Sequence, residues 1–123
     1  MTDELRTMTT YDGEAGTIQA YLARPNIEEP RPAVIVIHEI VGLTDHIKRV
    51  ADRFAEEGYV AFAPNLFSRP DLAEILTPAN ITEVMRFMTT VGWARASDPA
   101  FVQQAMSILP PEPRETVQRV LPV

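Results

Sequence analysis

A histidine and a glutamate, His38 and Glu39, directly follow a run of five apolar residues, 33–37. A strand of a parallel sheet that is covered by helices on both faces has such an unbroken apolar sequence. In open α/β sheets, ligands bind just beyond the carboxyl ends of these strands. The sequence therefore predicts that Glu39 lies where an active site would form, although a carboxylate there can also cap the next helix or pair with an arginine.

Two other groups of nearby residues have side chains that could form a nucleophile–base pair or a metal site. Ser68 with His38 as its base would make a nucleophile, but no serine of this chain stands on a predicted strand-to-helix turn. His38, Glu39 and His46 would make a metal site, but their spacing is not H-E-x-x-H. The commoner interpretation makes His38 a hydrogen-bonded structural residue and His46 a surface residue in the first turn of a helix. We therefore expect no metal and no cofactor.

The composition limits the class of protein. The 123 residues fit one domain by length, and 46% hydrophobic with 23% charged residues is typical of soluble globular proteins. A net charge of −6 argues against a nucleic acid partner. Zero cysteines exclude disulfides and a cysteine nucleophile within this chain. With no signal-peptide pattern and no long apolar span, we expect a cytoplasmic protein that does not contact a membrane.

The first part of the chain, residues 1–32, predicts a hairpin and a linker. Residues 5–11 and 17–24 are strand-like, and the Asp12-Gly13 pair between them is a turn signal. Polar and apolar residues alternate along 17–24, which indicates a half-buried edge strand. A proline-rich connection follows.

Residues 33–64 predict a strand–helix–strand unit. The first strand is 33–37, and Thr44 is the expected N-cap of the helix. Apolar residues then recur at helical spacing, at Ile47, Val50, Ala51, Phe54 and Ala55. Gly58 is the expected end of the helix, and 59–63 is a second strand. Strands joined by such a helix are parallel.

Residues 65–123 predict a loop followed by helices. We expect Asn80 to cap a first helix, Asp98 to cap a second with Pro99 at its first position, and residues 114–121 to form a third. The apolar face of the second helix would contain Phe101, Val102, Ala105, Ile108 and Leu109. Phe87 and Trp93, with Met85 and Met88, could line a substrate pocket or pack beneath a loop.

These elements are too few to cover both faces of the two central strands. The last helices also have apolar faces without a sheet of their own. We therefore predict that residues 1–123 form a single partial α/β domain, the first part of a sheet of the kind that commonly needs about 200–250 residues.

Residues 38–43 (HEIVGL), residues 57–67 (EGYVAFAPNLF) and the preceding hairpin together resemble dienelactone hydrolases. These are enzymes of the α/β-hydrolase fold that open a lactone ring. The resemblance covers residues 5–70, and residues 71–123 resemble less closely the segment before the nucleophile strand of longer relatives. It implies a partial α/β-hydrolase sheet, a hairpin plus one βαβ unit, followed by helices. The implied substrate is a small ester or lactone that bears a carboxylate.

The resemblance assigns roles to three positions. Glu39 matches the family glutamate that lies beside the nucleophile and changes partner when substrate binds. The backbone N–H of Ile40 matches a donor of the oxyanion hole, which stabilises the charge on the carbonyl oxygen during acyl transfer. Arg69 lies where family members often carry a basic residue that could meet a carboxylate of the substrate.

The nucleophile itself has no match. In the family it lies in Gly-x-Cys-x-Gly or Gly-x-Ser-x-Gly, and neither pattern occurs in this chain. We therefore expect the chain to supply the oxyanion and gating half of the site, to be inactive alone, and to need a second chain for the nucleophile half. The alternative is a non-enzymatic binding or assembly module that pairs with another chain through an exposed sheet edge.

Overall fold

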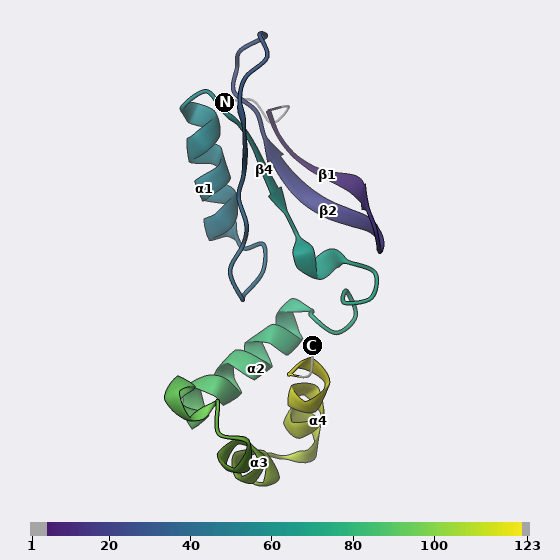
Figure 1. Ribbon diagram of the computed structural model, residues 1–123, viewed down its shortest axis with the longest axis vertical. Coiled ribbons are helices and arrows are strands. Elements are labelled where there is room, and N and C mark those ends of the chain that lie inside the picture. Colours follow the sequence, from purple (N-terminus) through teal and green to yellow (C-terminus); the bar gives the residue numbers. More distant parts are fainter. Residues whose placement is uncertain (1–4, 122–123) are drawn as a thin grey trace. The chain divides into compact units, whose positions relative to one another are not determined.

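The computed structural model describes residues 5–121, and the chain divides into two compact units (Figure 1). Unit 1, Met1–Glu74, contains the sheet and helix α1, and unit 2, Ile75–Val123, is helical. Each unit has a hydrophobic cluster of its own. The predicted assignment of residues 1–123 to a single partial domain stays a prediction.

Unit 1 has a four-stranded sheet in the order β1-β2-β4-β3. Its strands are β1 (Arg6–Gly13), β2 (Gly16–Ala23), β3 (Ala33–Ile35) and β4 (Val60–Pro64). β1 and β2 form the expected antiparallel hairpin, and β3 is parallel to β4. The predicted fold class, an α/β hairpin plus one βαβ unit followed by helices, is therefore confirmed.

The prediction that β2 is an edge strand is wrong. β2 pairs with β1 on one side and antiparallel with β4 on the other, so that Ala23 lies opposite Ala61. The half-buried alternation itself is present, since Ile18 and Ala20 are buried and Gln19 is exposed. Alternation reports which faces of a strand are covered, whereas strand neighbours lie in the plane of the sheet and leave no such pattern.

The strand predicted at 33–37 ends earlier, and only one of its faces is covered in the described part of the chain. β3 ends at Ile35, although the Val36 N–H still donates to the Phe62 carbonyl over 2.9 Å. Val36 is buried, whereas Ile35 and Ile37 are 64% and 59% exposed. The expected burial of this strand on both faces is not found within residues 5–121.

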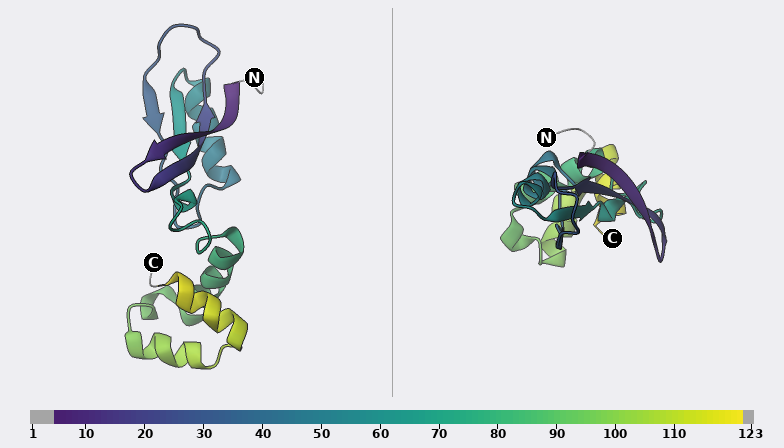
Figure 2. Two further views of the ribbon diagram at one scale, coloured as in Figure 1. Left: turned by 90° about the vertical axis from the view of Figure 1, so that its right-hand side faces the viewer. Right: turned by 90° about the horizontal axis from the view of Figure 1, so that it is seen from above.

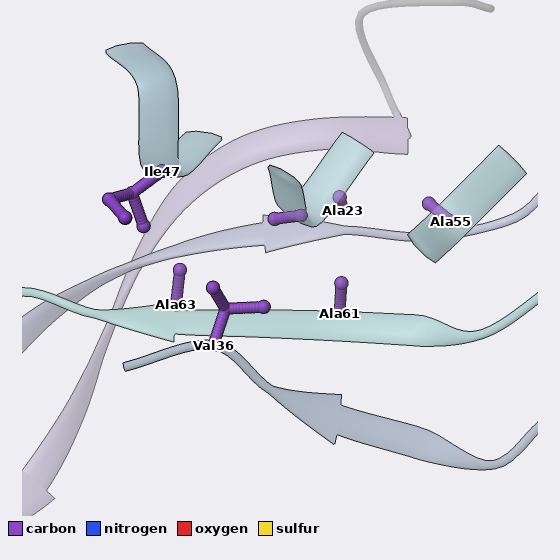
Figure 3. Close-up of a cluster of buried hydrophobic side chains, with 7 residues drawn as sticks. Ala23, Val36, Ile47, Ala55, Ala61 and Ala63 are labelled. Carbon is purple, nitrogen blue, oxygen red and sulfur yellow. The ribbon is translucent and has the colours of Figure 1, made fainter. Parts of the chain in front are cut away.

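Helix α1 (Asp45–Glu56) packs on the sheet as predicted, except that Phe54 of its predicted face is 37% exposed. It begins after Thr44, whose side chain accepts a hydrogen bond from the Ile47 N–H, and it ends before Gly58, whose φ is +97°. Figure 3 shows the contact, in which small side chains let helix and strands approach closely. The buried cluster contains Ala23, Val36, Ile47, Ala51, Ala55, Ala61 and Ala63.

Unit 2 contains the helices α2 (Pro78–Val91), α3 (Pro99–Ser107) and α4 (Pro111–Val120). Each begins with a proline at or beside its first position, where the missing N–H costs no helical hydrogen bond. Asp98 caps α3 as predicted, but the cap of α2 is Thr77 rather than Asn80. α4 likewise starts before the predicted residues 114–121.

The three helices, green to yellow in Figure 2, surround the second cluster. Its buried members are Val84, Phe87, Val91, Val117 and Val120. The predicted face of α3 packs on this cluster except at Ile108, which lies just beyond the end of the helix and is 83% exposed. Phe87 therefore packs in a core, while Trp93 is 52% exposed.

Candidate functional site

The segments that follow β3 and β4 lie side by side. Both strands run in the same direction, so their carboxyl ends meet at one edge of the sheet. The Leu66 N–H donates to His38 Nε2 over 3.0 Å, and the rings of His38 and Phe67 meet edge to face with 4.7 Å between centroids. The short helix η2 (Leu66–Ser68) therefore supports the loop that carries Glu39 and Ile40.

His38 is buried, with 9% of its surface exposed, and both of its ring nitrogens have partners. Nδ1 lies 2.7 Å from the Glu39 carbonyl oxygen, which can only accept a hydrogen bond, so Nδ1 carries the hydrogen. Nε2 faces the Leu66 N–H, which can only donate, so Nε2 is the acceptor. These bonds specify the neutral Nδ1–H tautomer, and they confirm the interpretation of His38 as a structural residue.

The peptide between Glu39 and Ile40 is held by its carbonyl oxygen. This oxygen accepts from His38 Nδ1 and from the Gly42 N–H over 3.0 Å. The peptide is trans, so its N–H points opposite to its carbonyl. Within residues 5–121 no hydrogen-bond acceptor pairs with the Ile40 N–H, and Ile40 is 62% exposed. The loop thus presents a free donor to the space beyond the sheet edge.

The carboxylate of Glu39 is exposed. Neither structural role considered for it is found among the described residues: Thr44 caps α1, and no arginine pairs with Glu39. A charged side chain therefore stands beside the free Ile40 N–H without a structural partner. Its part in gating the nucleophile stays a prediction.

Gly42 lets the loop turn back against η2. Its φ of +89° is one that residues with a side chain rarely adopt. A Cβ at this position would also lie 3.2 Å from Cδ2 of Phe67. Neither this contact nor the bond between His38 and Leu66 was predicted from the sequence. The available signal was that both segments follow strands predicted to be parallel.

The hydroxyl of Ser68 makes two hydrogen bonds with backbone groups. Its Oγ accepts from the Gln19 N–H over 2.9 Å and donates to the Asn65 carbonyl over 2.7 Å. No hydrogen bond joins Ser68 to His38 in the described part of the chain, so the structure does not form the nucleophile–base pair considered above. Ser68 instead connects η2 to β2.

Arg69 forms a two-point ion pair with Asp71. Nε lies 3.1 Å from Oδ1 and Nη2 lies 2.7 Å from Oδ2, and the two side chains are 43% and 52% exposed. The geometry of this pair does not test the predicted contact of Arg69 with a substrate carboxylate. The role of Arg69 in substrate binding therefore stays a prediction.

His46 is exposed in the first turn of α1, as predicted. Across residues 5–121, no three side chains of histidine, aspartate or glutamate come together in a way that could hold a metal ion. The same residues include no helix that is both long and apolar enough to cross a membrane.

Comparison with known proteins decides the family. The model of the dienelactone hydrolase family matches residues 18–121. This chain belongs to the dienelactone hydrolase family. The match confirms the predicted relationship and extends it through residues 71–121, where the resemblance was weaker.

Two relatives of this family member carry the name carboxymethylenebutenolidase. The one from Saccharolobus solfataricus is 44% identical over 99 residues, which are 80% of this chain and 37% of that protein. The one from Synechocystis is 42% identical over 84 residues, which are 66% of this chain and 34% of that protein. The chain thus spans about a third of the length of these curated relatives.

A solved structure described as a dienelactone hydrolase from Klebsiella pneumoniae also matches. It is 28% identical, with a TM-score of 0.48, and the match covers 75% of this chain and 44% of that one.

Proposed function

We propose that this chain supplies the oxyanion and gating half of a carboxylic ester or lactone hydrolase. The observation that supports this most directly is the free Ile40 N–H, which stands beside the unpaired carboxylate of Glu39 at the carboxyl edge of β3. Membership in the dienelactone hydrolase family supports hydrolysis as the reaction. The same membership is the reason to expect a nucleophile at this edge.

In this reaction a nucleophile from outside residues 1–123 attacks the carbonyl carbon of the substrate. Negative charge then develops on the carbonyl oxygen, and the Ile40 N–H donates a hydrogen bond to it. One such donor is worth about 3 kcal/mol in the transition state. The free carboxylate of Glu39 accepts a hydrogen bond from the nucleophile and adjusts its reactivity until the substrate displaces it.

The substrate is proposed to be small and to bear a carboxylate. The name of the relatives, carboxymethylenebutenolidase, describes an unsaturated lactone of this kind. Arg69 can bind the carboxylate in the two-point geometry that it now makes with Asp71. The pair with Asp71 is half-exposed and therefore weak, so a substrate carboxylate can replace Asp71.

The chain by itself is expected to be inactive, because it has neither nucleophile pattern. The test is the hydrolysis of p-nitrophenyl acetate by the purified chain, with the heat-denatured chain as control. No turnover above the control is expected. Turnover that Ser68→Ala removes would place the nucleophile in this chain and overturn the proposal.

The oxyanion role is tested in a chimera in which this chain replaces the matching 99-residue segment of the Saccharolobus solfataricus relative. Ile40→Pro removes the N–H, whereas Ile40→Ala shortens the side chain and keeps the N–H. We expect Ile40→Pro to lower kcat for p-nitrophenyl acetate about 100- to 1,000-fold. Ile40→Ala should leave kcat nearly unchanged, and equal losses in the two variants would contradict the proposal.

The role of Arg69 is tested in the same chimera with two esters that differ only in a carboxylate. Arg69→Gln should raise KM for the carboxylate-bearing ester and leave KM for the neutral ester unchanged. Asp71→Asn should lower KM for the carboxylate-bearing ester, because it frees Arg69. A change in KM that is the same for both esters would exclude Arg69 from carboxylate binding.

A second candidate function is a non-enzymatic assembly module in the cytoplasm. The position of β3 at the edge of the described sheet favours it, since a free edge pairs readily with another strand, and the exposed Ile35 on β3 and Ile37 just beyond it add apolar surface. Sedimentation of the chain over a range of concentrations tests this function, with Ile35→Lys as the comparison. A monodisperse monomer that melts cooperatively would count against it and against the need for a second chain.

A further inference from the structure

The loop that carries the proposed oxyanion donor receives little support from packing. Glu39, Ile40 and Val41 are all exposed, the last two by 62% and 40%. The direction of the Ile40 N–H therefore depends on what holds its own peptide. That peptide is held through the Glu39 carbonyl oxygen, by the Gly42 N–H within the turn and by His38 Nδ1.

Gly42 belongs to the same turn as this peptide, whereas His38 connects the peptide by a side-chain hydrogen bond to the segment that follows β4. Its ring is buried and rests edge to face against Phe67. Its Nε2 accepts from the Leu66 N–H, and Leu66 follows β4, which pairs with strands on both sides. A series of contacts thus runs from the inner strand β4 through Leu66 and His38 to the Glu39 carbonyl.

We infer that His38 is a positioning residue, whose neutral Nδ1–H tautomer orients the Glu39–Ile40 peptide so that the Ile40 N–H points at the substrate oxygen. This inference rests on the proposed role of Ile40. His38 neither touches the substrate nor transfers a proton. Both nitrogens are used within the protein, and the Leu66 N–H selects the tautomer that leaves Nδ1 able to donate.

The tautomer is the first test, and it uses the chain as it is. At alkaline pH, ¹⁵N NMR of the His38 ring should give the pattern of a protonated Nδ1 and an unprotonated Nε2. Leu66→Pro removes the N–H that faces Nε2, and it suits the first position of η2, which Asn65 precedes in an extended conformation. Leu66→Ala removes the same side chain and keeps the N–H.

In Leu66→Pro we expect a mixture of the two tautomers and faster motion of the Ile40 amide in ¹⁵N relaxation. Leu66→Ala should keep the single tautomer and the ordered Ile40 amide. A single Nδ1–H tautomer with an ordered Ile40 amide in Leu66→Pro would overturn the inference. So would the Nε2–H tautomer in the unchanged chain.

The second test measures catalysis in the chimera. His38→Phe keeps a ring against Phe67 and loses both hydrogen bonds, whereas His38→Gln offers one donor and one acceptor. We expect His38→Phe to lower kcat about tenfold with KM nearly unchanged, as for the loss of one hydrogen bond, and His38→Gln to recover most of it. If His38 has only a structural role, His38→Phe should lower the melting temperature and leave kcat of the folded fraction unchanged. That result would overturn the inference.

The outcomes separate this inference from the proposed function. If Ile40→Pro and Ile40→Ala behave alike, the oxyanion role of Ile40 fails, whatever the tautomer of His38. If Ile40→Pro is inactive while His38→Phe keeps full kcat, the oxyanion role stands and the positioning role of His38 is wrong.

Discussion

The two units of this chain are stabilised by different kinds of side-chain hydrogen bond. In unit 1 several of these bonds join residues that are far apart in the sequence, beside others that are local. Gln19 and Ser68 are 49 positions apart, Tyr21 and Asp52 are 31 apart, and Leu66 and His38 are 28 apart. Each of them joins one strand or its following loop to another element, and the last one supports the candidate site.

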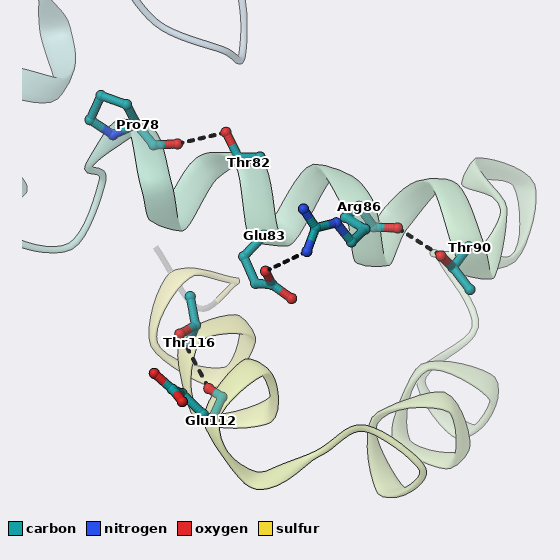
Figure 4. Close-up of polar contacts among 7 residues, drawn as sticks. All are labelled: Pro78, Thr82, Glu83, Arg86, Thr90, Glu112 and Thr116. Atoms are coloured by element: carbon teal, nitrogen blue, oxygen red, sulfur yellow. Dashed lines mark hydrogen bonds and ion pairs between the residues drawn. The ribbon is translucent and has the colours of Figure 1, made fainter.

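In the described part of unit 2, the side-chain hydrogen bonds span eight positions or fewer. Figure 4 shows four of them within α2 and α4, the pairs Thr82–Pro78, Arg86–Glu83, Thr90–Arg86 and Thr116–Glu112. These four bonds lie within single helices, whereas Arg114 of α4 donates to the carbonyls of Met106 and Ser107 in α3 and of Leu109 just beyond it. Among the described residues, the contact between α2 and α4 is therefore apolar packing, whereas unit 1 adds long-range hydrogen bonds that set the shape of the site.

The largest effect should come from the core of unit 2. Phe87 is 4% exposed, and Phe87→Ala should lower the free energy of unfolding by about 3–5 kcal/mol. The control is Trp93→Ala, because Trp93 is 52% exposed and should cost far less. Amide hydrogen exchange in α2 and α4 measures both. A small effect of Phe87→Ala would show that packing does not hold the helices together.

The next effect should come from Asp52 in unit 1. Its Oδ1 accepts from the Tyr21 hydroxyl over 2.7 Å and pairs with Arg6 Nε over 2.7 Å. Asp52→Ala leaves the Tyr21 hydroxyl and Arg6 Nε without this acceptor, although Arg6 Nη1 still donates to the Leu5 and Arg24 carbonyls. We therefore expect the free energy of opening of the hairpin, measured by amide exchange, to fall by about 1–2 kcal/mol. Glu56→Ala is the matched control, an exposed carboxylate on the same helix, and it should change little. Equal effects would remove the distinction between tertiary and local bonds.

This contrast explains which parts were predictable from the sequence. Caps and helix faces depend on residues within a few positions, so Thr44, Asp98 and the face of α1 apart from Phe54 were predicted. Two helices begin earlier than predicted, each at a proline. α2 begins at Pro78 with Thr77 rather than Asn80 as its cap, and α4 begins at Pro111. These errors were local too, since Pro78 and Pro111 are themselves the first residues of α2 and α4.

The rest depended on neighbours that the local sequence does not reveal. β2 is an inner strand because β4 pairs with it, forty positions later in the chain. The sequence indicated that His38 is hydrogen-bonded, but not that its partner is Leu66, and the orientation of the Ile40 N–H follows from that partner. Arg69 was singled out by resemblance alone, and its ion pair with Asp71 was not foreseen.

A smaller effect should appear in the pH dependence of unit 1. Burial, followed by the hydrogen bond to Asp52 and its negative charge, raises the pKa of Tyr21 from 10.0 to about 12, with Arg6 opposing. The unfolded chain therefore loses this proton first, so the stability that Tyr21 adds is complete below pH 10 and declines as the pH rises toward 12.

We expect this decline to be about 1 kcal/mol, because solvent screens the partly buried hydroxyl. It is measured as the difference in unfolding free energy between the unchanged chain and Tyr21→Phe, which cancels the titration of other groups. A difference that is constant from pH 9 to pH 12 would contradict the raised pKa.

The smallest effect should come from a local ion pair of unit 2. Arg86 lies 3.2 Å from Glu83 across one turn of α2, and its side chain is 69% exposed. Such a pair contributes about 0.3 kcal/mol. A double-mutant cycle with Glu83→Gln and Arg86→Gln isolates this contribution from the separate effects of the two substitutions. A coupling energy above that of the Tyr21–Asp52 pair, measured by the same kind of cycle, would mean that local bonds stabilise this protein as strongly as tertiary ones. In that case, the long-range hydrogen bond between Leu66 and His38, through which the Ile40 peptide is supported, would not differ in strength from the local bonds.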